Sequence, residues 1–383
     1  MTYLTARRKA IGLASSLALL GALAVGAQSQ AAPHPGASNT YTTVHFWNDL
    51  QLEFLPGDTW ERLRDNLQWL DRSHDARVQH WIEYYRANPS NVVSIIERAR
   101  PWMAWISEKV ETRGLPGEIA LIPFVESSFD PTARSHRGAA GLWQFMPGTG
   151  DALGLSRRNG YDGRLDVVAS TEAALDYIEL QAEQWYEGDL ELSLAAYNAG
   201  AGTVNRARHA AGARGEPTDY WHLQLPNETM NYLPKLNAIA AIIADPEAHG
   251  IDLPEIDDAP AFAKITVETP IDLGQLATMS GVDRDDLSAL NPGLTNGSAH
   301  PATADVILVP VEHEETVLAH LSTPATPSTG AHQHVVTRGD SLSSIAALHG
   351  SSVEEIRQHN GLNGDLIHEG QRLDIPRRSL AAR

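Results

Sequence analysis

The sequence contains no cysteine. This absence excludes disulfide bonds, thiol catalysis and cysteine-bound metal centres, and we also expect no lipid anchor of the kind attached to a cysteine. Basic residues are scarce, since 29 Lys and Arg stand against 48 Asp and Glu and the formal net charge is −19. A surface of this sign repels nucleic acid and gives no long-range attraction to an anionic polymer. An anionic partner would therefore be held by short-range stacking and hydrogen bonds.

Metal-ligand patterns are missing as well. His332 and His334 are close in sequence, but they lie near a predicted linker with no cysteine or helical partner at the spacing of a zinc site. The sequence therefore predicts no metal and no other cofactor.

The first 31 residues have the features of an export signal. Arg7, Arg8 and Lys9 precede an apolar run rich in Ala and Gly over residues 10–27, and small residues follow up to Ala31. We expect cleavage near Ala27 or Ala31 rather than retention as a membrane anchor. The arginine pair is compatible with twin-arginine export and equally with an ordinary signal.

The length of 383 residues allows two or three domains after this signal. Changes in composition and periodicity place the boundaries. The predicted segments are a flexible stretch at 32–57, a helical extension at 58–113, a mainly helical central domain at 114–245, a linker at 246–261, a small module at 262–312, a second linker at 313–332 and a second module at 333–377.

The most informative stretch is Val125 to Gly150, VESSFDPTARSHRGAAGLWQFMPGTG. The spacing of apolar residues before it predicts a short helix that ends near Glu126. A carboxylate at a helix C-terminus opposes the helix dipole, and the neighbours Val125 and Phe129 exclude water. Both effects raise the pKa of Glu126 and favour an acid able to donate a proton near pH 7.

The residues after Glu126 combine flexible backbone with aromatic and amide side chains. Gly138 and Gly141 allow close approach of the backbone to a ligand, Trp143 and Phe145 offer flat apolar faces, and Gln144 offers a donor and an acceptor. This mixture suits a sugar. The alternative is a buried turn with Glu126 as a solvated helix end.

The C-terminal part repeats itself at an offset of 69 residues, with Val267 to Asn291 matching Val336 to Asn360. The second copy reads strand, helix, helix, strand. In it we predict Asp340 as the cap of the first helix, Gly350 as its stop, and Ser352 with Glu355 as the capping box of the second helix. The first copy has Pro270-Ile271 in place of Gly339-Asp340, so we expect it to lose the cap and to bind weakly or act as a spacer.

Four motifs in this order resemble one family. They are Glu126-Ser127, Gly141-Leu142-Trp143-Gln144, Ala196-Tyr197-Asn198-Ala199-Gly200 and Glu228-Thr229-Met230-Asn231-Tyr232. Together they resemble the lytic transglycosylase domain of the soluble lytic transglycosylase and goose-type lysozyme superfamily, and most closely its murein transglycosylase D group. The second repeat resembles a LysM domain. The resemblance implies a mainly α, lysozyme-like catalytic domain followed by small α+β modules of βααβ order.

The resemblance also implies roles. Glu126 would be the catalytic acid and base, acting on peptidoglycan between N-acetylmuramic acid and N-acetylglucosamine and leaving 1,6-anhydro ends. The implied substrate-binding residues are Ser135, Gln144, Met146, Thr149, Tyr197, Asn198, Glu228 and Tyr232, with the Tyr197 hydroxyl close to the catalytic carboxyl. The implied glycan-binding residues of the LysM domain are Gly339, Asp340, Ser341, Leu342, Asn360, Gly361 and Leu362. The exported protein would work in the periplasm, associated with the wall.

Two alternatives stay open. A hydrolytic muramidase would need a positioned water and a second carboxylate. Candidates for that carboxylate are Asp130, Asp151, Glu172 and Asp176, for which surface or capping roles are expected. An inactive scaffold that binds peptidoglycan is the other alternative.

Overall fold

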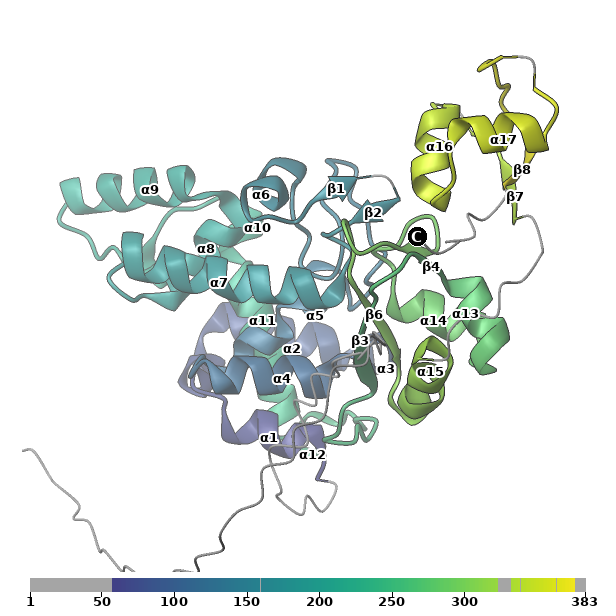
Figure 1. Ribbon diagram of the computed structural model, residues 1–383. Coiled ribbons are helices and arrows are strands. Elements are labelled where there is room, and N and C mark those ends of the chain that lie inside the picture. The colour runs from purple at the N-terminus through teal and green to yellow at the C-terminus, as the bar shows by residue number, and fades with distance from the viewer. Residues whose placement is uncertain (1–56, 159, 323–331, 338, 363, 376–383) are drawn as a thin grey trace, which may run out of the picture. The chain divides into compact units, whose positions relative to one another are not determined.

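The computed structural model describes residues 57–375, except 159, 323–331, 338 and 363. The predicted signal peptide and most of the predicted flexible segment lie outside the described residues. The described chain is mainly helical, with small two-stranded sheets concentrated toward its C-terminal half. Figure 1 shows the order of the elements along the chain.

The N-terminal extension is helical, as the sequence predicts, and consists of four α-helices and one 3₁₀ helix. Aspartates start two of them, since the side chains of Asp58 and Asp75 accept hydrogen bonds from the first turns of α1 and α2. The elements are α1 (Thr59–Asp65), the 3₁₀ helix Leu70–His74, α2 (Ala76–Arg86), α3 (Pro89–Ala99) and α4 (Met103–Thr112).

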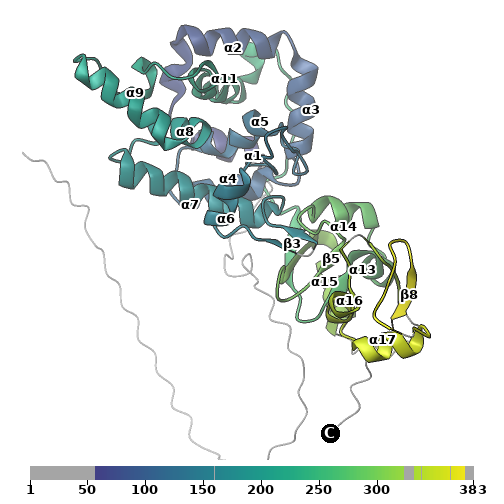
Figure 2. The same cartoon turned by 90° about the horizontal axis from the view of Figure 1, so that it is seen from above.

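The central part is built around one buried helix, α11. Nearly all of its residues are buried, and it packs against α2, α5 and α8 (Figures 1 and 2). The elements are the 3₁₀ helices Gly117–Leu121 and Tyr220–His222, α5 (Ile122–Glu126), α6 (Pro147–Ala152), the hairpin of β1 (Arg157–Arg158) and β2 (Tyr161–Asp162), α7 (Val167–Trp185), α8 (Leu190–Ala199), α9 (Ala201–Ala213), α10 (Asn227–Met230), α11 (Tyr232–Ala244) and α12 (Pro246–His249).

The sequence predicts one kinked helix from Asn227 to Asp245, and the structure instead has two helices. The break lies at Asn231, before Tyr232 rather than after it. Pro234 then falls in the first turn of α11, where its missing N–H leaves no helical hydrogen bond unmade. Tyr232 is therefore the first residue of the buried helix.

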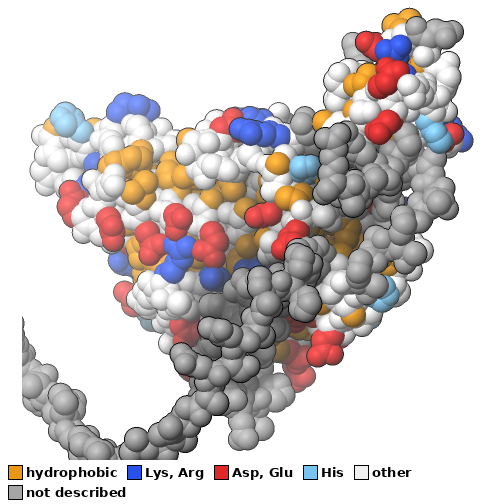
Figure 3. All heavy atoms as spheres, in the orientation of Figure 1, with side chains coloured by type: hydrophobic (Ala, Val, Ile, Leu, Met, Phe, Trp, Pro, Cys, Tyr) orange, Lys and Arg blue, Asp and Glu red, His pale blue; other side chains and the backbone are white. Residues whose placement is uncertain are grey.

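The surface of the helical part carries more acidic than basic residues, and many of the basic side chains form ion pairs with acidic ones. Arg113 contacts Glu172, Asp176 and Glu179 of α7 at distances of 2.6, 2.6 and 2.7 Å. Figure 3 shows acidic side chains gathered around a basic one over α7. Pairing of this kind limits self-repulsion in a chain with a large negative charge.

The first repeat folds as a complete small module. Its strands β3 and β6 pair antiparallel, with Phe262 opposite Pro310 and Thr266 opposite Val306. The prediction that its first helix lacks a cap is wrong, because the Asp272 side chain accepts from the Gln275 N–H at 3.0 Å. The elements are β3 (Phe262–Thr266), β4 (Ile271–Asp272), α13 (Leu273–Ser280), α14 (Arg284–Leu290), β5 (Ser298–Ala299), β6 (Val306–Pro310), the 3₁₀ helix Val311–His313 and α15 (Glu314–Ser322).

This first module is packed against the helical part, which its predicted role as a spacer does not foresee. The Phe262 ring lies 5.6 Å from that of Trp102 and 5.9 Å from that of Trp105. The Asp162 N–H of strand β2 donates to the Gly293 carbonyl at 2.9 Å. The module therefore shares a hydrophobic core with the extension helices.

The second repeat has the predicted order of strand, helix, helix and strand. The Ser352–Glu355 capping box and the left-handed Gly350 stop are confirmed. The first helix is capped by Ser341 and not by Asp340, whose carboxylate instead accepts from the Thr337 N–H at 2.8 Å. The elements are β7 (His332–Val335), α16 (Leu342–His349), α17 (Val353–His359) and β8 (Arg372–Ile375).

Candidate active site

Glu126 lies at the C-terminus of α5, where the sequence predicts it. Pro123 stands in the first turn of this short helix, and Ser127 follows as its C-terminal cap. The Tyr232 hydroxyl donates to Glu126 Oε1 at 2.6 Å and fixes the carboxyl from the start of α11. Two segments that are 106 residues apart are thereby joined at one acidic group.

Burial raises the pKa of Glu126 to about 7. Loss of water disfavours the charged form, and the nearby charge of Glu228 acts in the same direction. The hydrogen bond from Tyr232 and the charge of Lys235 act in the opposite direction. The carboxyl can therefore hold a proton near neutral pH and also lose it, which a group acting first as acid and then as base requires.

The backbone around the carboxyl is strained. Ser128, Phe129 and Gln144 have positive φ angles of 54°, 56° and 48°, which residues other than glycine rarely adopt. Arg98 holds the first of these turns, because its Nε donates to the Ser128 carbonyl at 2.8 Å. Strain of this kind persists where packing enforces it, and it is concentrated at functional sites.

The glycine-rich loop is braced from behind by a buried ion pair. Arg164 is 4% exposed and donates to Asp162 through Nε and Nη2 at 3.0 and 2.9 Å. Its Nη1 donates to the Gly138 carbonyl at 2.7 Å and to the Phe145 carbonyl at 3.2 Å. Sequence reasoning missed Arg164, because it lies outside every motif and the loop carbonyls that it binds are 19 and 26 residues earlier in the sequence.

Glycine is required at position 141, because the backbone of Arg164 passes close to the loop there. Its φ is +81°, and a Cβ built there would lie 1.9 Å from the Arg164 carbonyl oxygen. Only glycine can occupy this position without moving one of the two segments.

The predicted sugar platform of Trp143 and Phe145 is wrong. Both rings are buried, and the Trp143 indole donates to the Thr171 hydroxyl of α7 at 2.8 Å. These side chains anchor the loop in the core. The buried-turn alternative holds for them.

Gln144 and Met146 have the accessibility that substrate contacts need. The Gln144 amide nitrogen donates to the Gly141 carbonyl at 2.8 Å, and no donor from the described residues bonds to the amide oxygen. Met146 is 43% exposed and precedes α6, so it does not fill the core. Thr149 follows in α6 and is half-buried.

The remaining predicted residues fall into two groups. Tyr197 donates to the Trp143 carbonyl at 2.6 Å, and Asn198 accepts from the Thr229 hydroxyl at 2.8 Å, so both brace the loops around the site. The hydroxyl that reaches Glu126 is that of Tyr232, although burial and the charge of Glu126 raise the Tyr197 pKa well above its usual value. Ser135 and Glu228 are exposed. The Ser135 hydroxyl also accepts from the Ala139 N–H at 2.9 Å and closes the turn before Ala140.

Each candidate for a second catalytic carboxylate is engaged elsewhere. Asp130 accepts from Thr132, Asp151 pairs with Arg157, and Glu172 and Asp176 pair with Arg113. These contacts agree with the surface and capping roles expected for them.

The predicted LysM glycan loops are only partly free. Leu342 is buried and Leu362 packs against the module core. Asn360 donates to the Ile356 and Asp374 carbonyls and accepts from the Asp374 N–H, so its side chain clamps β8. Gly339 and Gly361 lie at turns with positive φ angles, and Ser341 is the N-cap of α16. The Ser341 N–H donates to the Ser344 hydroxyl at 2.9 Å, and the Gly361 N–H donates to the Gln358 carbonyl at 3.3 Å.

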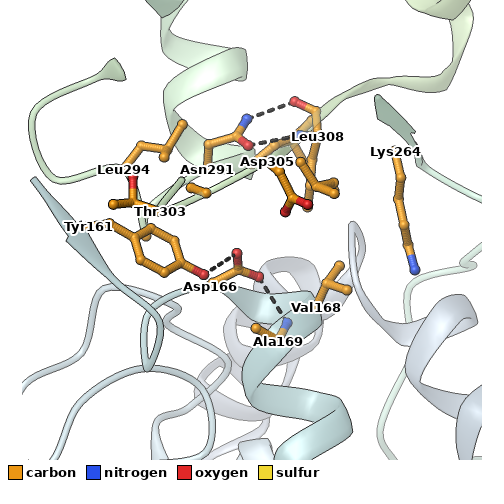
Figure 4. Close-up of a pocket in the computed structure, with 14 residues that line it drawn as sticks. Tyr161, Asp166, Val168, Ala169, Lys264, Asn291, Leu294, Thr303, Asp305 and Leu308 are labelled. Carbon is orange, nitrogen blue, oxygen red and sulfur yellow. Dashed lines mark hydrogen bonds between the residues drawn. The ribbon is translucent and has the colours of Figure 1, made fainter. Parts of the chain in front are cut away.

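A pocket also lies where the first module meets the helical part. Figure 4 shows Tyr161 and Asp166, joined by a hydrogen bond of 2.9 Å, facing Asn291 and Leu308 of the module. None of the predicted site residues lines it, so it is separate from Glu126. Among the described residues, no cluster of His, Asp and Glu could hold a metal ion, and no helix is long and apolar enough to cross a membrane.

Comparison with known families agrees with this geometry. Residues 103–219 match the Transglycosylase SLT domain, residues 334–376 match the LysM domain, and residues 261–326 match the LysM-like domain of lytic transglycosylase MltD. The membrane-bound lytic murein transglycosylase D of Escherichia coli (strain K12) is 36% identical over 98% of this chain and 86% of its own length.

The chain belongs to the lytic murein transglycosylases. The SLT match of this transglycosylase includes Glu126, the glycine-rich loop and Tyr197. Shorter similarities extend to the membrane-bound lytic murein transglycosylase F 1 of Alkalilimnicola ehrlichii, 30% identical over 36% of this chain and 29% of its own length. An N-acetylmuramoyl-L-alanine amidase of Staphylococcus aureus is 31% identical over 29% of this chain and 32% of its own length.

Proposed function

We propose that this lytic transglycosylase cleaves the β-1,4 bond between N-acetylmuramic acid and N-acetylglucosamine and leaves 1,6-anhydro-N-acetylmuramic acid ends. The observation that carries the proposal is the single half-buried carboxyl of Glu126, held by Tyr232 at 2.6 Å, with a pKa raised to about 7. One such group can serve twice, first as acid and then as base.

The proposed reaction begins with proton transfer from Glu126 to the oxygen that leaves with C4 of N-acetylglucosamine. The bond from that oxygen to C1 of N-acetylmuramic acid breaks, and the positive charge at C1 is stabilised by the carbonyl of the substrate's own N-acetyl group. Ionised Glu126 then takes the proton of the C6 hydroxyl, and the C6 oxygen bonds to C1. No water is consumed, and Glu126 ends protonated as it began.

The neighbouring residues are proposed to hold the sugar in this geometry. Met146 and the Gln144 oxygen face the substrate, Glu228 and Ser135 offer exposed polar groups, and Thr149 adds a nearby hydroxyl. Tyr197 and Asn198 act by bracing the loops. Tyr232 sets the position and the pKa of the carboxyl.

Mass spectrometry of digested sacculi distinguishes this reaction from hydrolysis. We expect ends lighter by one water than reducing ends. Glu126→Gln should lower the rate of muropeptide release at least about a hundredfold, the lower end for loss of general acid catalysis. Reducing ends would indicate a muramidase, and unchanged release by the variant would contradict the role of Glu126.

Export and attachment complete the proposal. Residues 1–31 would direct the chain to the periplasm and be removed, and the module at 333–377 would hold peptidoglycan through the backbone of its loops. The catalytic unit would consist of the extension at 58–113, the catalytic domain at 114–245 and the docked module at 262–312. The segment 246–261 would link the catalytic domain to the docked module, and the segment 313–332 would link the docked module to the module at 333–377. Fractionation of cells, with N-terminal sequencing of the mature protein, tests the first of these points.

A further inference from the structure

Lys235 lies beside the catalytic carboxyl on α11. It follows Tyr232, whose hydroxyl contacts Glu126, by less than one turn of helix. The Lys235 side chain is half-buried, and its charge makes a small contribution that lowers the Glu126 pKa against the larger effect of burial. The cation is therefore at the rim of the proposed reaction site.

Within the described part of the chain, the ammonium group of Lys235 has no carboxylate partner. Among the described residues, no ion pair or hydrogen bond engages it, whereas many of the arginines are paired with Asp or Glu. Its close contact is the Trp81 ring, whose centroid lies 4.7 Å from Nζ. A cation over an aromatic face is held in place while its N–H donors stay open to a further acceptor.

Trp81 is itself fixed as a support. Its indole donates to the Asn231 side chain at 3.0 Å, and its ring meets the Tyr84 ring edge to face at 5.2 Å between centroids. Trp81 is half-buried and Tyr84 is 47% exposed, so α2 presents an accessible aromatic surface next to Lys235. Of the three aromatic residues Trp81, Tyr84 and Tyr85 of α2, only Tyr85 is buried in the core, with 6% exposure.

We propose that Lys235, held on Trp81, is an anion subsite that binds a carboxylate of the glycan substrate. The inference rests on the proposed function, which places the saccharide bond at Glu126. A peptidoglycan strand offers carboxylates on its peptide stem and, where the stem is absent, on the lactyl group of N-acetylmuramic acid. A carboxylate and an ammonium form a charge-assisted hydrogen bond, which is stronger than one between neutral groups.

The subsite would also couple binding to catalysis. A carboxylate on Lys235 offsets the charge that lowers the Glu126 pKa, so the bound substrate favours the protonated acid at the moment when the proton is needed. An uncharged glycan would lack this effect.

The test compares kcat/KM for Lys235→Met and the wild type on three substrates across pH. These are native sacculi, sacculi whose carboxylates are amidated with carbodiimide and ammonia, and strands stripped of peptide by an amidase. On native sacculi we expect a loss of about tenfold, carried mainly by KM, the lower range for a lost charge-assisted hydrogen bond. On amidated sacculi we expect no difference between the two proteins once each is compared at its optimum pH.

The stripped strands identify the source of the carboxylate. A loss that persists on them assigns the lactyl group, and a loss that disappears assigns the peptide stem. Lys235→Arg should recover part of the lost KM. Equal losses on native and amidated sacculi would overturn the subsite.

Lys264→Met is a matched control. Lys264 Nζ lies 4.7 Å from the centroid of the Trp105 ring, the same geometry, but in the first module. The Lys264→Met variant should have the same kcat/KM as the wild type on all three substrates. The proposed function is tested separately, because its failure would appear as wild-type protein that releases no anhydro product from any substrate.

Discussion

At the scale of single residues, the site depends on how Glu126 is surrounded. The helix end and its apolar neighbours follow from local sequence, and both the position and the raised pKa were predicted from them. The partner hydroxyl was not, because the choice between Tyr197 and Tyr232 depends on where α8 and α11 pack. Trp143 and Phe145 were misread for the same reason: an aromatic residue beside glycines looks accessible until its distant partner, here Thr171, is known.

The raised pKa of Glu126 has a consequence for stability. Because the folded protein binds this proton more tightly than the unfolded chain, burial of the charged form lowers the stability as pH rises from the ordinary value of 4.5 to about 7. Glu126→Gln should therefore raise the free energy of unfolding at pH 8, by roughly 3 kcal/mol as an upper bound, and by little at pH 4. Thermal melts at both pH values check this. A variant no more stable than the wild type at pH 8 would show that the carboxylate is well solvated.

Tyr232→Phe tests the hydrogen bond that opposes this effect. Removing the hydroxyl removes a donor that stabilises the carboxylate, so the Glu126 pKa should rise further and the alkaline limb of the pH–rate profile should move to higher pH. We also expect kcat to fall about tenfold, because the carboxyl loses the hydrogen bond that orients it for the two proton transfers. An unshifted alkaline limb would mean that this bond does not exist in the working enzyme.

At the scale of elements, the glycine-rich loop is shaped by what lies behind it. Arg164 ties the loop to Asp162, and neither residue belongs to a motif. The sequence shows the glycines, but only the packing explains why Gly141 is needed. Helix caps were likewise predicted only in part: Ser352 and Glu355 were predicted, whereas Asp272 was missed because the alignment with the second repeat pointed one residue earlier, to Ile271.

Gly141→Ala should destabilise the protein by about 3 kcal/mol and reduce activity, since a Cβ would meet the Arg164 carbonyl at 1.9 Å. Gly188→Ala is the control. Its φ of +88° is similar to the +81° of Gly141, but a Cβ there meets nothing within 4 Å. Urea denaturation of both variants separates backbone strain from the clash. Similar losses in the two would show that the close approach to Arg164 is unimportant.

At the scale of the whole molecule, the two repeats have different relations to the enzyme. Most buried residues of the first form a cluster of their own, but Phe262, Leu290 and Leu308 belong to the same core as the extension helices, whereas the buried residues of the second all lie in its own small core. Sequence similarity identified both as copies of one fold. It could not show that one copy is docked, because docking depends on the surface of another part of the chain.

Two truncations should therefore behave differently. Removing residues 333–383 should leave the melting temperature and the cleavage of short soluble glycans unchanged while weakening attachment to sacculi, which a pelleting assay measures. Removing residues 261–383 should lower the melting temperature by several degrees as well, because it exposes the apolar surface around Trp102 and Trp105. If both truncations melted like the full chain, the docked module would add nothing to the stability of the helical part.

One asparagine recurs in both repeats and explains how they could diverge. Asn360 joins α17 to β8 through one hydrogen bond to Ile356 and two to Asp374, and Asn291 joins α14 to β6 in the same way through one hydrogen bond to Leu287 and two to Leu308. As long as these hydrogen bonds are kept, the outer loops of a duplicated module can change without loss of the fold. A protein engineer who wishes to graft new recognition loops onto either copy should keep that asparagine and treat the rest of the rim as open to redesign.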